Sequence, residues 1–71
     1  MDEKKIISIV SKALKAKINA KSTIYNTQQW DSLGHLSILS ALQKATKGKS
    51  SKIDLTEAQS IKDLTVKLKK L

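Results

Sequence analysis

The stretch Gln29–Leu36, QWDSLGHL, joins an uncharged polar loop to the most apolar helical run of the chain. Asp31 and Ser32 are typical of a helix start, because a short side-chain oxygen accepts hydrogen bonds from the first-turn amides. The free backbone N–H groups at such a start also favour an incoming phosphate. Ser32 therefore has two interpretations, as a structural cap or as an exposed hydroxyl that can be modified.

Downstream of this stretch the apolar spacing predicts a helix from Asp31 or Ser32 to about Thr46. Its broad apolar face comprises Leu33, Leu36, Ile38, Leu39, Ala41, Leu42 and Ala45. The positions expected at its surface are Gly34, His35, Ser37, Ser40, Gln43 and Lys44. Lys47–Lys52 then breaks the pattern as a flexible basic loop, with Gly48 as the helix C-cap. Gly48-Lys49-Ser50 lacks the upstream glycine and strand of a phosphate-binding loop, so we discount that function.

Upstream, apolar residues spaced by three and four predict an amphipathic helix from Asp2 to about Ala16. Residues 19–29 lack helical periodicity and are expected to form a long connecting loop. The only large apolar side chains available to anchor that loop are Ile24, Tyr25 and Trp30. We therefore expect these three side chains to hold the loop against the core.

Two capping-box patterns follow the basic loop. Asp54 and Glu57 predict a short helix to about Gln59, and Ser60 and Asp63 predict the start of a final helix. The final helix carries an apolar stripe, Ile61, Leu64, Leu68 and Leu71. The expected fold is all-α, a small four-helix bundle of three main helices and one short helix, in one domain over residues 1–71. Its expected core comprises Leu14, Leu39, Leu42, Ile61, Leu64 and Leu68.

Composition agrees with a single small helical domain. The 71 residues are 39% hydrophobic, with no Pro and only two Gly. The absence of Cys excludes disulfides, cysteine-bound zinc and a thiol nucleophile, and His35 alone does not suggest a metal site. No stretch has the form of a signal peptide or a membrane span, so we expect a soluble, cytoplasmic protein with no membrane partner.

The charge is strongly positive. Fourteen basic residues, all lysine, against six acidic ones give a formal net charge of +8. Such a charge favours nucleic acid, an anionic membrane or an acidic protein as partner. The lack of Arg and the scarcity of aromatic residues argue against base readout. An alternative function is nevertheless a lysine-rich bundle that binds nucleic acid or an anionic surface through phosphate contacts.

Taken in order, the chain resembles the acyl and peptidyl carrier proteins, and the resemblance covers nearly all of it. The specific part is Trp30–Leu36 followed by Ile38, Leu39, Ala41 and Leu42. Ser60–Leu64, SIKDL, is similar to the start of the last helix in that family. The expected bundle is therefore acyl-carrier-protein-like, and the chain would be a carrier rather than an enzyme, with no catalytic residue of its own.

The resemblance implies that Ser32 accepts a 4′-phosphopantetheine arm from coenzyme A, delivered by a magnesium-dependent phosphopantetheinyl transferase. The arm would hold an acyl or aminoacyl group as a thioester, loaded by a ligase and passed to a downstream transferase. Asp31 would help the phosphopantetheinyl transferase to dock and to place its metal, and Leu33 would lie beside the root of the arm. A Ser-His hydrolase is a weaker interpretation, because no third group is expected to orient His35.

Partner docking would use the helix that follows Ser32, with Leu36, Ser37 and Lys44 at the contact. In the family this helix carries acidic residues that meet basic enzymes, whereas this chain has Ser37, Gln43 and Lys44 there. We therefore expect specialised partners with an acidic or neutral docking surface. Leu36, Leu39 and Leu42 could line an acyl cleft or simply form the core. The expected state is a monomer without nucleic acid.

Overall fold

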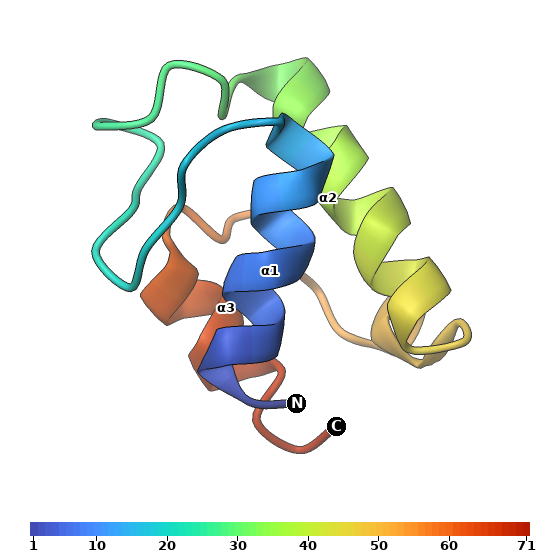
Figure 1. The fold of residues 1–71 in the computed structure, drawn as a ribbon. Helices are drawn as coiled ribbons and strands as arrows, with labels where there is room; N and C mark the ends of the chain where they lie inside the picture. Colours follow the sequence, from blue (N-terminus) through green and yellow to red (C-terminus); the bar gives the residue numbers. More distant parts are fainter.

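The computed structural model describes all 71 residues and contains three α-helices and no β-sheet (Figure 1). The helices are α1 (Glu3–Leu14), α2 (Ser32–Ala45) and α3 (Ile61–Lys67), and a short 3₁₀ helix, η1 (Lys49–Lys52), follows α2. Helix α1 contacts both α2 and α3. The expectation of a small all-α fold with three main helices is confirmed, and no helix is long and apolar enough to cross a membrane.

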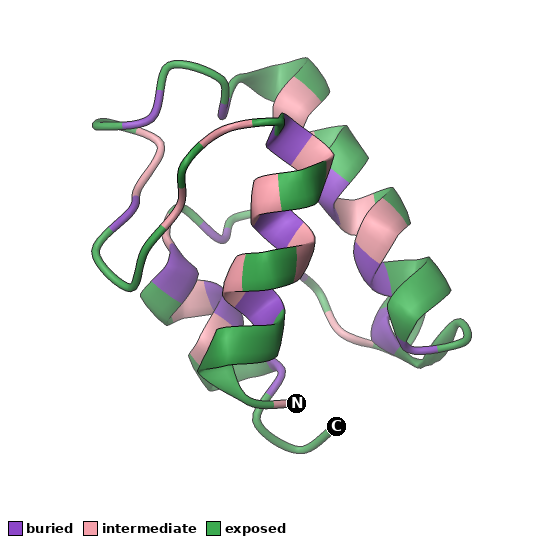
Figure 2. Ribbon diagram, in the orientation of Figure 1, coloured by how far each residue is buried: buried purple, intermediate pink, exposed green.

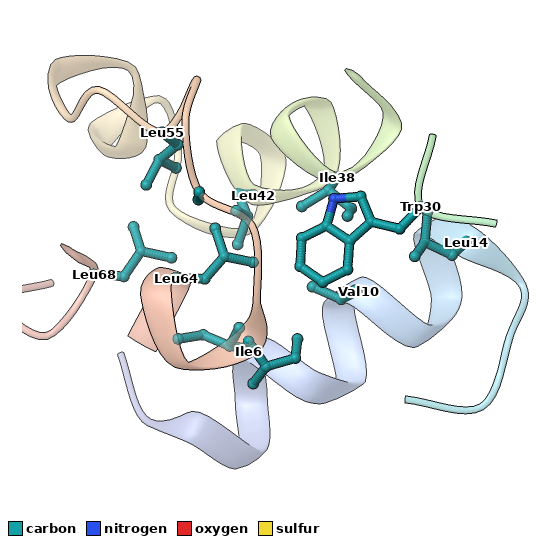
Figure 3. Packing of buried hydrophobic residues seen from close by; sticks show 11 residues of the cluster. Ile6, Val10, Leu14, Trp30, Ile38, Leu42, Leu55, Leu64 and Leu68 are labelled. Carbon is teal, nitrogen blue, oxygen red and sulfur yellow. The ribbon is translucent and has the colours of Figure 1, made fainter. Parts of the chain in front are cut away.

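The core lies where the three helices meet and also contains residues from two irregular segments (Figures 2 and 3). Its buried members are Ile6, Val10, Leu14, Trp30, Ile38, Leu42, Leu55, Ala58, Ile61, Leu64 and Leu68. Five of the six predicted core residues are among them, whereas Leu39 is only partly buried. Ile38 and Leu42 lie one helical turn apart and face the core, so Leu39, about 100° round the helix from Ile38, packs at the edge of the core rather than inside it.

Helix α1 begins as predicted but ends earlier. The Asp2 carboxylate caps it by accepting from the Lys5 N–H at 2.8 Å. The chain leaves the helix at Lys15, which has a left-handed φ of 53°, and the Ala16 N–H returns to the Ser11 carbonyl. This local turn ends the helix about two residues before the end that the sequence predicts.

The loop between α1 and α2 is ordered mainly by short polar side chains that bond to its own backbone. Asn26 accepts from the Thr23 N–H and donates to the Lys21 carbonyl, and Ser22 accepts from the Asn19 N–H. Ile24 packs against the core, but Tyr25 is 81% exposed, so the predicted anchoring by Tyr25 is wrong. Asn, Ser and Thr compete well for backbone hydrogen bonds in turns, and they replace the aromatic anchor that we expected.

The predicted short helix over residues 54–59 does not form. Asp54 accepts from the Thr56 N–H, and one turn closes between the Ala58 N–H and the Leu55 carbonyl. A further helical turn would need the Gln59 N–H to donate to the Leu55 carbonyl. The Gln59 N–H instead donates to Asp63. The six-residue segment therefore forms too few helical hydrogen bonds to offset the free-energy cost of helix nucleation.

Two further boundaries differ from the sequence predictions. The basic loop is not simply flexible, because η1 forms within it and the Ser50 N–H donates to the buried Thr46 hydroxyl. Helix α3 begins with Ser60 accepting from the Asp63 N–H, as the capping box predicts, but it ends at Lys67 rather than near Leu71.

Candidate functional site at the start of α2

Ser32 is the first residue of α2, and the capping contact belongs to its neighbour Asp31. Asp31 Oδ1 accepts from the Gly34 N–H at 2.8 Å, and the Asp31 carbonyl accepts from the His35 N–H. Ser32 is exposed, and its hydroxyl makes no hydrogen bond within the chain. The structural role predicted for the Asp-Ser pair is therefore fulfilled by Asp31, and the Ser32 hydroxyl is exposed without a hydrogen-bond partner.

Ser32 lines an open groove of about 980 Å³ between the start of α2 and the segment 56–59. Apolar lining comes from Ile24, Trp30, Leu36 and Ala58. The charged side chains in the lining are those of Asp31 and Glu57, and no lysine contributes to it. The groove is therefore locally acidic in a chain whose net charge is +8.

His35 is a structural link rather than the exposed residue that we expected. Its Nδ1 accepts from the Trp30 indole N–H at 3.1 Å, and its Nε2 lies 3.0 Å from the Leu55 carbonyl oxygen. The two ring planes lie within 17° of parallel, with centroids 6.4 Å apart, so the rings meet edge to edge through this hydrogen bond. Because the indole N–H only donates and a carbonyl only accepts, the neutral His35 ring must carry its proton on Nε2.

This geometry bears directly on the hydrolase interpretation. Trp30 and Leu55 orient the His35 ring, so the expectation that nothing orients it is wrong. Both ring nitrogens are, however, already used in these two contacts. His35 therefore has no free nitrogen to take a proton from Ser32, and the structure offers no Ser-His catalytic pair.

Gly34 supports the site through its lack of a side chain, which the sequence did not reveal. A Cβ added there would lie 2.1 Å from the Gln29 carbonyl oxygen and 2.9 Å from Leu14 Cδ2. The end of the preceding loop therefore packs directly on the first turn of α2. Gly34 is partly buried rather than exposed, and the signal for its role was only the glycine itself near a helix start.

The predicted docking residues lie on the exposed surface of α2. Leu33 is 75% exposed and Leu36 is 61% exposed, and both Ser37 and Lys44 are also exposed. Leu36 is therefore excluded from the core and lines the groove instead, whereas Leu42 is fully buried. Leu39 lines a separate pocket of about 420 Å³ against residues 50–56.

The opposite end of α2 is basic. Lys47 and Gly48 have positive φ angles of 55° and 87°, and the Gly48 N–H donates to the Gln43 carbonyl. Gly48 therefore helps to end the helix, although Lys47 occupies the first left-handed position. Four lysines at this end, Lys44, Lys47, Lys49 and Lys52, are exposed, and no acidic residue lies between Ser32 and Ile53.

Comparisons with protein-family models, with curated proteins and with solved structures found no match for this chain. The structure also brings together no group of three or more His, Asp or Glu side chains that could hold a metal ion. The free hydroxyl of Ser32 and the groove beside it are therefore the features on which a functional assignment depends.

Proposed function

We propose that this chain is a carrier domain of the acyl-carrier type, which holds an acyl or aminoacyl group as a thioester on a 4′-phosphopantetheine arm attached to Ser32. The observation that carries the proposal is the exposed Ser32 hydroxyl, which stands at the first position of α2 without a hydrogen bond, while both ring nitrogens of His35 are engaged elsewhere. A serine in this setting does not attack a substrate unaided. It is suited to modification by an enzyme that brings its own base.

The residues around Ser32 fit a phosphodiester at that hydroxyl. The backbone N–H groups of Ser32 and Leu33 have no acceptor in the chain, and such N–H groups at a helix start favour a phosphate. Asp31 uses Oδ1 for its cap, so its exposed Oδ2 remains available to the transferase and its magnesium ion. Leu33 and Leu36 lie beside the serine and offer apolar contact to the arm.

Partners would dock on the exposed face of α2, through Leu36, Ser37 and Lys44. Because this face carries no acid, we expect acidic or neutral surfaces on the loading ligase and on the downstream transferase. Lys44→Glu should slow transfer to the cognate enzyme at low salt, whereas Lys62→Glu on α3 serves as the matched charge control. Equal slowing by both variants would indicate a general charge effect rather than docking on α2. The carrier would act as a monomer in the cytoplasm.

The decisive experiment is incubation with coenzyme A, magnesium and a promiscuous phosphopantetheinyl transferase, followed by intact-mass spectrometry. We expect the mass of one arm on the wild type and on Ser37→Ala, which removes another exposed serine of α2. Ser32→Ala should gain no mass while remaining helical by circular dichroism, because the cap is Asp31. Loading of Ser32→Ala, or no loading of the wild type by several transferases, would contradict the proposal.

A second candidate function is the binding of nucleic acid or an anionic surface, favoured by the exposure of all fourteen lysines. Phosphate-driven binding weakens steeply as salt rises and shows little sequence preference. Titration of a DNA duplex into the protein at two salt concentrations tests for this binding, whereas the gain of the arm in the mass measurement tests for a carrier.

A further inference from the structure

The link between Trp30, His35 and Leu55 joins three segments around the groove. Trp30 ends the long loop, His35 lies in the first turns of α2, and Leu55 begins the segment that forms the opposite wall. We propose that His35 is a positioning residue that holds the groove beside Ser32 in its present shape and releases the Trp30 side of it on gaining a proton.

The two contacts of His35 require one protonation form of its ring. Trp30 Nε1–H can only donate, so Nδ1 of His35 must present a lone pair. The Leu55 carbonyl can only accept, so Nε2 must carry the hydrogen. Only the neutral ring with its proton on Nε2 satisfies both partners.

The second step is the effect of a second proton on the ring. A proton on Nδ1 removes the acceptor of the Trp30 indole and sets two N–H groups against each other. Trp30 is only 3% exposed, so its indole N–H would be left buried without a partner. The contact from Nε2 to Leu55 survives, because a protonated ring still donates there. The change is therefore confined to the Trp30 side of the link.

The charged side chains around the groove favour a different position for the protonated ring. The charged side chains that line the groove with His35 are Asp31, one helical turn before it, and Glu57 on the opposite wall. Both are carboxylates, and no lysine lines the groove. A protonated His35 is thus repelled by the Trp30 donor and attracted towards the groove, which gives the site two distinct arrangements.

Ser32 lies between Trp30 and His35 in the sequence and lines the same groove. Displacement of the Trp30 ring therefore changes the surface on which a modifying enzyme would meet the serine. This consequence for modification rests on the proposed function, whereas the proton-driven change in the link does not.

Trp30 and His35 are the sole Trp and His of the chain, so both can be followed without ambiguity. The test is titration from pH 8 to pH 5, with Trp fluorescence and the indole N–H proton resonance recorded together. We expect the wild type to show a one-proton transition in which the fluorescence shifts to the red and the indole resonance moves upfield. His35→Gln keeps one acceptor and one donor but does not titrate, and His35→Phe keeps neither.

His35→Gln should resemble the wild type at pH 8 and show no transition, and His35→Phe should resemble the wild type at pH 5 throughout the titration. A transition in the wild type that persists in His35→Gln, or an indole resonance that does not move between pH 8 and pH 5, would overturn the proposal. Far-UV circular dichroism at each pH confirms that the helices persist. If His35→Phe fails to fold, the comparison of wild type with His35→Gln still shows whether the transition depends on protonation of His35.

The effect on Ser32 is measured as the ratio of the loading rates of wild type and His35→Gln at each pH, because the pH dependence of the transferase cancels in that ratio. We expect the ratio to be near one at pH 8 and to change across the transition. A constant ratio would show that the link does not position the site for modification. Absence of loading at every pH would instead contradict the proposed carrier function and leave the spectroscopic test of the link intact.

Discussion

The two ends of α2, about 20 Å apart, are shaped by different physical interactions. Each contains one of the two glycines of the chain. Gly34 is needed for space, because the Gln29 carbonyl and Leu14 pack against its backbone, whereas Gly48 has open space around it and a left-handed φ of 87°. Distant segments therefore shape the Ser32 end, and local turn geometry shapes the basic end.

The two ends of α2 also differ in the charge of the side chains around them. The groove at the Ser32 end is lined by Asp31 and Glu57 without a lysine, and the far end carries Lys44, Lys47, Lys49 and Lys52 without an acid. Under the proposed function, an enzyme that modifies Ser32 would meet an acidic surface, and a partner that docks along α2 would also meet a basic one. The net charge of +8 therefore describes neither end of α2 by itself.

The largest expected effect separates buried from exposed leucines along α2. Leu42→Ala removes a fully buried side chain from the core and should lower the free energy of unfolding by roughly 2–5 kcal/mol. Leu36→Ala, at an exposed position near Ser32, should change it by no more than about 0.5 kcal/mol. Urea denaturation of both variants measures the difference. Similar losses in the two variants would mean that the face of α2 turned to the core is wrongly assigned.

Gly34→Ala should be the next most damaging change. The new Cβ would lie 2.1 Å from a backbone oxygen, so the loop end must move away from α2, at a cost of about 1–3 kcal/mol. Thermal unfolding by circular dichroism measures the loss, and weaker loading of Ser32 should accompany it because the first turn of α2 shifts. A melting temperature equal to that of the wild type would show that the loop does not pack on this turn.

Gly48→Ala tests the other end. No atom obstructs the added methyl group, so the cost is that of a left-handed alanine, about 1–2 kcal/mol. We expect Gly48→Asn to lose less, because Asn tolerates this conformation. Loading of Ser32 should be unaffected by either variant, in contrast to Gly34→Ala. Equal losses for alanine and asparagine would argue against backbone conformation as the reason for Gly48.

The smallest effect concerns Asp54, in the segment that leads from η1 to the groove wall. The Thr56 backbone N–H, then the Thr56 hydroxyl and the charge of Lys67, lower the pKa of this carboxyl below its ordinary value of 3.8. A lowered folded-state pKa means that Asp54 stabilises the fold above about pH 3.8 and that this contribution disappears as the pH falls through the lowered value.

Asp54→Asn keeps an acceptor for Thr56 but cannot titrate. We expect the wild type to be slightly more stable than this variant at pH 5, with the two converging as the pH approaches 2. Denaturation curves at intervals between these limits provide the measurement. A stability difference that stays constant over the whole range would exclude the titration of Asp54 as its source.

Much of the fold could be predicted from periodicity and capping. The three main helices, the caps at Asp31 and Ser60, and most of the core follow from residues close together in the sequence. The helix expected over residues 54–59 failed because two contacts compete with its local capping signal. The Leu55 carbonyl lies against His35, twenty residues earlier, and the Gln59 N–H donates to Asp63, just beyond the expected helix. The prediction for Tyr25 was wrong because the size and apolarity of a side chain do not show whether the core has space for it.

The sequence by itself determined that Asp31 and Ser32 open a helix, that one small helical domain forms, and that lysine dominates the surface. These features depend on contacts within one or two turns and on composition. Only the tertiary structure decided that Ser32 is free while Asp31 caps, that Gly34 admits the loop end, and that His35 links Trp30 to Leu55. Such contacts join residues whose separation and orientation are set by the packed core, and no local pattern encodes them.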